Sequence, residues 1–90
     1  MLQAIYKVPD GKLLKVFLEK EEERIQTITI TGDFFMYPEE KIEELERMLV
    51  GEELHEEKLH RSIQTFVEQE GLELFGVDIE SLVQVILMCN

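Results

Sequence analysis

Hydrophobic and polar residues alternate through the first half of the chain, the pattern of strands with one buried face. Apolar side chains occupy every second position within three segments, at about residues 2–8, 12–19 and 24–31. These positions are Leu2, Ala4, Tyr6 and Val8, then Leu14, Val16 and Leu18, then Ile28 and Ile30. The connections between the segments are short, so the pattern predicts a three-stranded antiparallel meander with one dry face.

The first connection has the residues of a tight turn. In "VPDGK", at 8–12, Pro9 presets one backbone angle, Asp10 can bond its own backbone and Gly11 accepts a positive φ before Lys12 starts the next strand. The second connection, "KEEE" at 20–23, is too charged to pack and predicts an exposed hairpin loop.

The second face of this sheet has a mixed composition. Leu13, Phe17 and Ile25 fall on it together with charged residues and threonines. Such a face is neither clearly solvated nor clearly buried, and we expect part of it to be covered.

The hydrophobic period changes to about 3.6 in the second half, which predicts three helices. The first begins at Pro38 and stops at Gly51, and the second runs from about Glu56 to Glu70. The third starts at an Asp78 cap. Its core stripe consists of Ile79, Leu82, Val83 and Ile86, with Val85 and Met88 lying off that stripe. The order βββααα predicts one α+β domain over residues 1–90, with two layers and the helices on one face of the sheet.

The charge and cysteine content of the chain limit the partners and the location that are expected for it. Its 90 residues include 20 Asp and Glu against 9 Lys and Arg, a formal net charge of −11. Such a surface repels nucleic-acid phosphates and anionic lipids, so neither nucleic acid nor membrane is an expected partner. A single cysteine, no signal peptide and no long apolar run favour a cytoplasmic location.

Candidate catalytic chemistry is sparse. No glycine-rich phosphate loop is present, and Cys89 lies at the end of a helix with nothing to lower its pKa. His55 and His60 would point about 140° apart around a helix, so they cannot share a metal from one helix. Most carboxylates fall in charged runs that read as solvated faces. We therefore predict no catalytic, metal-binding or cofactor-binding residue, and a binding or structural module rather than an enzyme by itself.

The junction between strands and helices contains four consecutive large apolar residues, in the stretch "GDFFMYP" at 32–38. Gly32 ends the third strand and Asp33 can cap the following turn. One interpretation makes Phe34 and Phe35, or at least one of them, a hydrophobic plug between sheet and first helix. The four large side chains at 34–37 cannot all point inward on an irregular segment, because its backbone also needs hydrogen-bond partners.

Part of this junction is therefore expected at the surface, where it would suggest a partner site. The candidates for partner binding are Phe35, Met36 and Tyr37, with at least one of them exposed. Val85 and Met88, which lie off the stripe of the last helix, are the other two candidates.

Four stretches are distinctive: "YKVPDGKLLKVFLE" (6–19), "RIQTITITGDFF" (24–35), "EEKIEELERMLVG" (39–51) and "GVDIESLVQVI" (76–86). With them, the chain resembles the accessory domain of lipoate–protein ligases over about residues 5–87. The motif positions are Pro9, Gly11, Lys12, Gly32, Asp33, Phe34 and Gly51. The most specific pieces are "KVPDGKL" and "GDFF", in that order with two strands between them. The "HEEKLHRSI" stretch of the second helix departs from the family and adds no support.

The resemblance implies a non-catalytic role in protein lipoylation. No catalytic domain precedes the first strand, so the form in which this domain is a separate small subunit is the expected match. In this family a catalytic subunit uses ATP, Mg and lipoate to make lipoyl-AMP and then modifies a lysine of a lipoyl carrier domain. The resemblance thus implies a cytoplasmic heterodimer in which this chain enables adenylation and binds no cofactor itself.

Two other classes of function are alternatives to a role in lipoylation. The first is a free-standing α+β protein-binding or scaffold module with no role in lipoylation. A scaffold for iron–sulfur clusters would need several cysteines, whereas the chain has only Cys89. A small hydrolase or transferase that uses its carboxylates has no support in their spacing.

Overall fold

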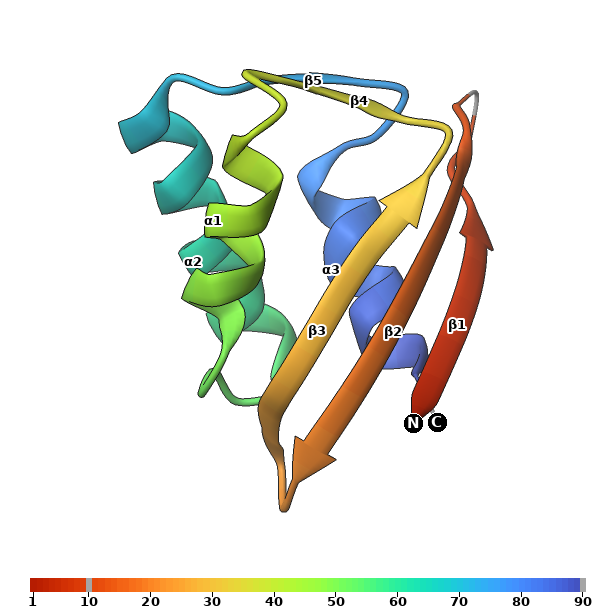
Figure 1. Ribbon diagram of the computed structural model, residues 1–90, viewed down its shortest axis with the longest axis vertical. Coiled ribbons are helices and arrows are strands. Elements are labelled where there is room, and N and C mark those ends of the chain that lie inside the picture. Colours follow the sequence, from red (N-terminus) through yellow and green to blue (C-terminus); the bar gives the residue numbers. More distant parts are fainter. Residues whose placement is uncertain (10, 90) are drawn as a thin grey trace.

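A computed structural model describes residues 1–9 and 11–89 of the chain (Figure 1). Its elements follow the predicted order with two additional short strands. The strands are β1 (Leu2–Lys7), β2 (Leu13–Glu21), β3 (Arg24–Gly32), β4 (Phe35–Tyr37) and β5 (Glu73–Phe75), and the helices are α1 (Lys41–Leu49), α2 (Glu56–Glu70) and α3 (Ile79–Met88). Asp10, the predicted middle of the first turn, lies outside the described residues.

The first three strands form an antiparallel sheet in the order β1-β2-β3. Ala4 of β1 pairs with Val16 of β2, which pairs with Ile30 of β3. The three side chains share the buried face, since alternate residues of a strand point to the same side. The period-two pattern of the sequence therefore places the inner face of this sheet correctly.

A β-bulge in β3 corrects one prediction about the outer face. Glu19 pairs with Thr27 but Lys20 pairs with Ile25, so Gln26 is an extra residue on β3. The shift in alternation turns Ile25 inward, where only 1% of its surface is exposed. Ile25 is thus a core residue, and its expected place on the mixed outer face is wrong.

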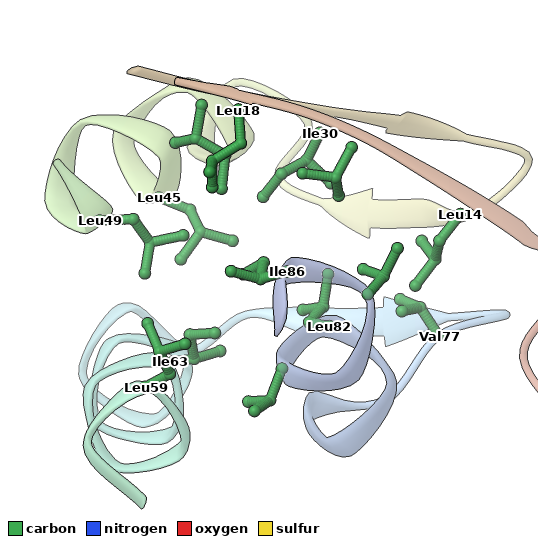
Figure 2. Close-up of a cluster of buried hydrophobic side chains, with 14 of the residues drawn as sticks. Leu14, Leu18, Ile30, Leu45, Leu49, Leu59, Ile63, Val77, Leu82 and Ile86 are labelled. Carbon is green, nitrogen blue, oxygen red and sulfur yellow. The ribbon is translucent and has the colours of Figure 1, made fainter. Parts of the chain in front are cut away.

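All three helices lie on one side of this sheet, which confirms the two-layer arrangement. Helices α1 and α3 pack directly on the strands, and α2 packs against α3 and α1. Figure 2 shows the resulting core between sheet and helices. Its fully buried leucines and isoleucines come from every layer: Leu14, Leu18, Leu45, Leu49, Leu59, Ile63, Leu82 and Ile86.

The helix ends agree with the sequence except at the start of α1. Helix α1 begins at Lys41, not at Pro38 as predicted, because Tyr37 still belongs to a strand and the chain must turn through 38–40. Helix α2 ends at Gly71, which has φ +62°. The Asp78 side chain accepts a hydrogen bond of 2.7 Å from the Ser81 N–H at the start of α3, which confirms the predicted cap. Among the residues described, no helix combines the length and apolarity needed to cross a membrane.

Candidate partner-binding site

The junction at 34–37 contains a strand, β4, that pairs antiparallel with β5 across one end of the molecule (Figure 1). Met36 pairs with Leu74, and both face inward: Met36 is buried and Leu74 packs against the core. Phe35 pairs with Phe75 on the opposite face. The same alternation that buries Met36 thus turns its neighbours on β4 out of the molecule.

The outward side of β4–β5 is mostly aromatic, with Glu73 beside Tyr37 as its acidic member. Phe35 is 58% exposed, Tyr37 63% and Phe75 51%. We call these three residues the aromatic face. Large aromatic side chains that a small chain leaves in water, gathered on one short sheet, mark a surface suited to a protein partner.

The surface beside the aromatic face is hollowed. A depression of about 180 Å³ is lined by Gly32, Phe34, Phe35, Met36, Glu39 and Ile42. Its volume is below the roughly 300–1,000 Å³ of small-molecule sites. It fits one inserted side chain of a partner better than a nucleotide or an acyl cofactor.

The four large residues at 34–37 therefore differ in exposure, because the side chains of β4 alternate between its two faces. Phe35 and Tyr37 are exposed, as expected of at least one residue of this stretch. Met36 is 3% exposed and packs in the core, so it can offer a partner no more than the small part of its surface that lines the depression. Phe34, predicted as a plug, is half-buried and packs against the core.

Of the two candidates on α3, Val85 is corrected, whereas Met88 stays a prediction. Val85 is fully buried, and Met88 is only partly exposed and packs against the core. Helix α3 contacts β1 and β2 on one side and α2 on the other, so its second apolar side meets another helix of the same chain. Val85 is therefore a core residue, and the last turn of α3 lies at the opposite end of the fold from β4–β5 (Figure 1).

Phe75 is the residue that sequence reasoning missed. The signal was present in "GLELFG" at 71–76, where Leu72 and Leu74 alternate with Glu73 and Phe75 between two glycines. A bounded period-two run of this kind predicts a short strand. Only the fold shows that its partner is β4, which lies more than thirty residues earlier in the chain.

The motif residues hold the backbone that supports this site. Gly32 has φ +148°, and an added Cβ would lie 2.2 Å from the Leu13 carbonyl oxygen, so a glycine is required there. The next N–H, of Asp33, donates to the same Leu13 oxygen at 3.0 Å. Asp33 thus fixes the turn into β4 through its backbone N–H.

The first turn joins the other strand of the site. The N–H of Lys12 donates to the Gly76 carbonyl at 3.2 Å, immediately after β5. A Cβ on Gly11 would lie 2.8 Å from that same carbonyl oxygen, which favours glycine there. Pro9 is exposed in this turn. Gly51, predicted as a left-handed stop, has φ +91° two residues after the end of α1.

The ion pairs of Lys41 and the pKa of Cys89 have structural rather than catalytic explanations. The Lys41 Nζ lies 2.9 Å from Glu70 and 3.1 Å from Glu44, and these two hydrogen bonds raise the pKa of Lys41. This contact fixes the start of α1 to the end of α2. Burial raises the pKa of the Cys89 thiol, the opposite of what a nucleophilic cysteine needs.

The chain was compared with known proteins. Residues 5–86 match the family described as the bacterial lipoate protein ligase C-terminus. Subunit 2 of lipoate-protein ligase A from Thermoplasma acidophilum is 42% identical over 72 residues, which cover 80% of this chain and 73% of that protein.

The fold gives an independent comparison. A solved structure described as an archaeal lipoylation system, a bi-partite lipoate protein ligase and its E2 lipoyl domain from Thermoplasma acidophilum, superposes with a TM-score of 0.82. The match is 38% identical and covers 96% of this chain and 94% of that chain. Sequence and fold agree over almost all of the chain, which belongs to the family of lipoate–protein ligase C-terminal domains.

Proposed function

We propose that this protein is the accessory subunit of an ATP-dependent lipoate–protein ligase and acts by binding the catalytic subunit through its aromatic face. The observation that carries the proposal is the exposure of Phe35, Tyr37 and Phe75 on one side of β4–β5. Folding alone gives no reason to leave three large aromatic side chains in water. The relative from Thermoplasma, a ligase subunit by name, supports the same role.

The proposed division of labour assigns all reacting groups to the catalytic subunit. That subunit would bind ATP, Mg and lipoate, form lipoyl-AMP and transfer the lipoyl group to a lysine of a lipoyl carrier domain. Because lipoyl-AMP is a mixed anhydride that water hydrolyses, its site must exclude water once it forms. A subunit docked beside that site can order a mobile loop and complete the adenylating geometry without contributing a catalytic residue.

The charge of the chain supports this assignment. With a formal net charge of −11, the chain is a poor host for the triphosphate of ATP. We therefore propose a cytoplasmic heterodimer in which the carrier domain contacts mainly the catalytic subunit. The comparisons do not support the alternative of a scaffold module unrelated to lipoylation.

The decisive experiment mixes the purified chain with the purified catalytic subunit and follows lipoate-dependent pyrophosphate release. We expect the rate to rise with added chain and to saturate at one equivalent, while this chain alone releases nothing. Full activity of the catalytic subunit by itself would contradict the proposal. So would pyrophosphate release by this chain alone.

A further inference from the structure

A second surface of the chain is left without a partner, on the side of the sheet opposite the helices (Figure 1). It lies over β1 and the first half of β2, where Lys7 pairs with Leu13 and Ile5 pairs with Lys15. Ile5 is 57% exposed and Leu13 46%. We call these four residues and the adjacent Phe17 the lysine face.

The charge of this face differs from that of the whole chain. Outward residues that pair with Lys15 and Phe17 are Ile5, Thr31, Gln3 and Thr29, none of them acidic. The first carboxylate on the same face of β2 is Glu19, towards the hairpin. A chain with net charge −11 therefore presents a locally basic and apolar surface here.

The lysines of this face are not used within the described part of the chain. Arg24, Lys41 and Lys58 each form an ion pair with a glutamate, whereas the ion pairs of the described residues include neither Lys7 nor Lys15. The Lys15 Nζ instead lies 5.0 Å from the ring centroid of Phe17. This cation–π contact holds the ammonium group over an apolar surface, where it remains available to a carboxylate.

The lysine face adjoins the aromatic face through the start of β2. The Leu13 carbonyl accepts the hydrogen bond from Asp33 that leads into β4, and the Lys12 N–H bonds to Gly76 directly after β5. A Cβ on Gly76 would lie 2.9 Å from the Lys12 Cγ, so the stem of Lys12 covers this junction. The two faces therefore meet at the backbone of Lys12 and Leu13.

We infer that the lysine face binds a carboxylate-bearing surface of the catalytic subunit, so that one interface continues from the aromatic face around the start of β2. The inference rests on the proposed function and adds the chemistry of the partner: carboxylates opposite Lys7 and Lys15, and apolar side chains opposite Ile5 and Leu13. A second copy of this chain does not fit, because symmetric contact would set lysines against lysines between two chains of net charge −11. Opposite charges across the contact speed docking and fix its register.

The test uses the double variant Lys7→Glu/Lys15→Glu and measures its Kd for the catalytic subunit at low and high salt. We expect the double variant to bind at least about tenfold more weakly near 0.1 M salt, and to lose the decrease of affinity with salt that the unmodified chain shows. Arg61→Glu is the control for a charge reversal at a remote site, since Arg61 is an exposed cation on α2. Its affinity should change by less than about twofold, because screening limits charge effects to roughly 10 Å at this salt. Unchanged melting temperatures would show that all three chains are folded.

Two results would overturn the inference while leaving the proposed function intact. One is a double variant that binds like the unmodified chain at both salt concentrations. The other is normal binding with slower transfer to the carrier domain, which would assign the lysine face to the carrier instead. By contrast, an unmodified chain that neither binds the catalytic subunit nor stimulates pyrophosphate release would refute the proposed function itself.

Discussion

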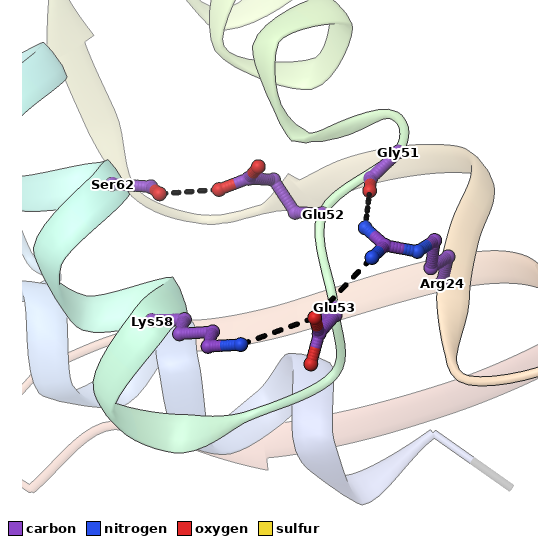
Figure 3. Close-up of polar contacts among 6 residues, drawn as sticks. All are labelled: Arg24, Gly51, Glu52, Glu53, Lys58 and Ser62. Atoms are coloured by element: carbon purple, nitrogen blue, oxygen red, sulfur yellow. Dashed lines mark hydrogen bonds and ion pairs between the residues drawn. The ribbon is translucent and has the colours of Figure 1, made fainter.

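The two ends of the molecule are both closed by backbone pairing, but their side chains differ in kind. At the hairpin end, residues 51–53 lie along the edge of β3, where the Ile25 N–H donates to the Glu52 carbonyl at 3.0 Å. Arg24 donates to the Gly51 carbonyl at 2.8 Å and to Glu53 at 3.3 Å (Figure 3).

The same glutamate joins this end to a helix. Lys58 of α2 donates to Glu53 Oε1 at 3.1 Å, and Ser62 donates to Glu52 (Figure 3). The polar groups of the hairpin end therefore find partners inside the chain. Folding by itself accounts for these residues.

At the β4–β5 end the backbone pairing is similar, but no residue within 1–9 and 11–89 covers the aromatic face. Burial of such side chains would contribute about 1.5–3 kcal/mol each, and their exposure forgoes that stabilisation. Local structure is thus sufficient to explain the contacts at one end, whereas the proposed partner explains the exposed aromatic side chains at the other.

The largest effect is expected from Gly32→Val at the turn into β4. A valine there would combine φ +148° with a Cβ 2.2 Å from the Leu13 carbonyl oxygen. We expect at least about 2–3 kcal/mol of destabilisation in chemical denaturation, or failure to fold. Gly71→Ala is the control: φ is +62°, nothing lies within 4 Å of its Cβ, and the cost should be about 1 kcal/mol. Equal losses for the two variants would show that Gly32 is not sterically required.

Phe35→Asp should separate binding from stability. Charge at the centre of the aromatic face should weaken binding to the catalytic subunit by about 30-fold or more, the range of interface hot spots. The melting temperature should change little, because Phe35 is 58% exposed. Val50→Asp is the matched control, since Val50 is 50% exposed but lies at the hairpin end. If both variants bound equally well, or lost affinity equally, the contrast between the two ends would be removed. Tyr37→Asp should likewise weaken binding to the catalytic subunit and leave the melting temperature nearly unchanged.

Much of this fold was predictable because its signals are local. Hydrophobic periods of two and 3.6 located the first three strands and all three helices. The Asp78 cap set the start of α3 and Gly71 the end of α2, whereas α1 ends at Leu49, before the predicted stop at Gly51. The residues that could not be predicted depend on contacts distant in sequence. Ile25 turns inward because of one extra residue on β3, and Val85 is buried because α3 lies between sheet and α2.

The candidate site was only half predictable for the same reason. An apolar run at 34–37 indicated that part of it must be exposed, but not which part. Pairing of β4 with β5 decides that Met36 points inward while Phe35 and Tyr37 point outward, and it adds Phe75. A three-residue strand carries too few positions to reveal its alternation before its partner is known.

Met36→Ala tests which side chains of β4 face inward. Met36 is 3% exposed, so removal of its side chain should cost about 2 kcal/mol of unfolding free energy. Its neighbour Phe35 is the control, and Phe35→Ala should cost no more than about 0.5 kcal/mol. Denaturant titration of both variants measures the difference. A larger loss for Phe35→Ala would reverse the assignment of inward and outward faces on β4.

The smallest effect is expected at the hairpin end, from Glu53→Gln. Lys58 is the main cause of the lowered pKa of Glu53, with a smaller contribution from Arg24, so the pKa lies below its ordinary value of 4.5. A carboxyl with a lowered folded-state pKa stabilises the fold above its unfolded pKa and loses this contribution as the pH falls through the folded value. Near pH 7 the unmodified chain should therefore melt at a slightly higher temperature than Glu53→Gln. The two melting temperatures should converge as the pH falls below 4.5. Binding to the catalytic subunit should not change, because this network belongs to the end that folding already explains. A difference in melting temperature that persisted in acid would mean that Glu53 acts through packing rather than through its charge.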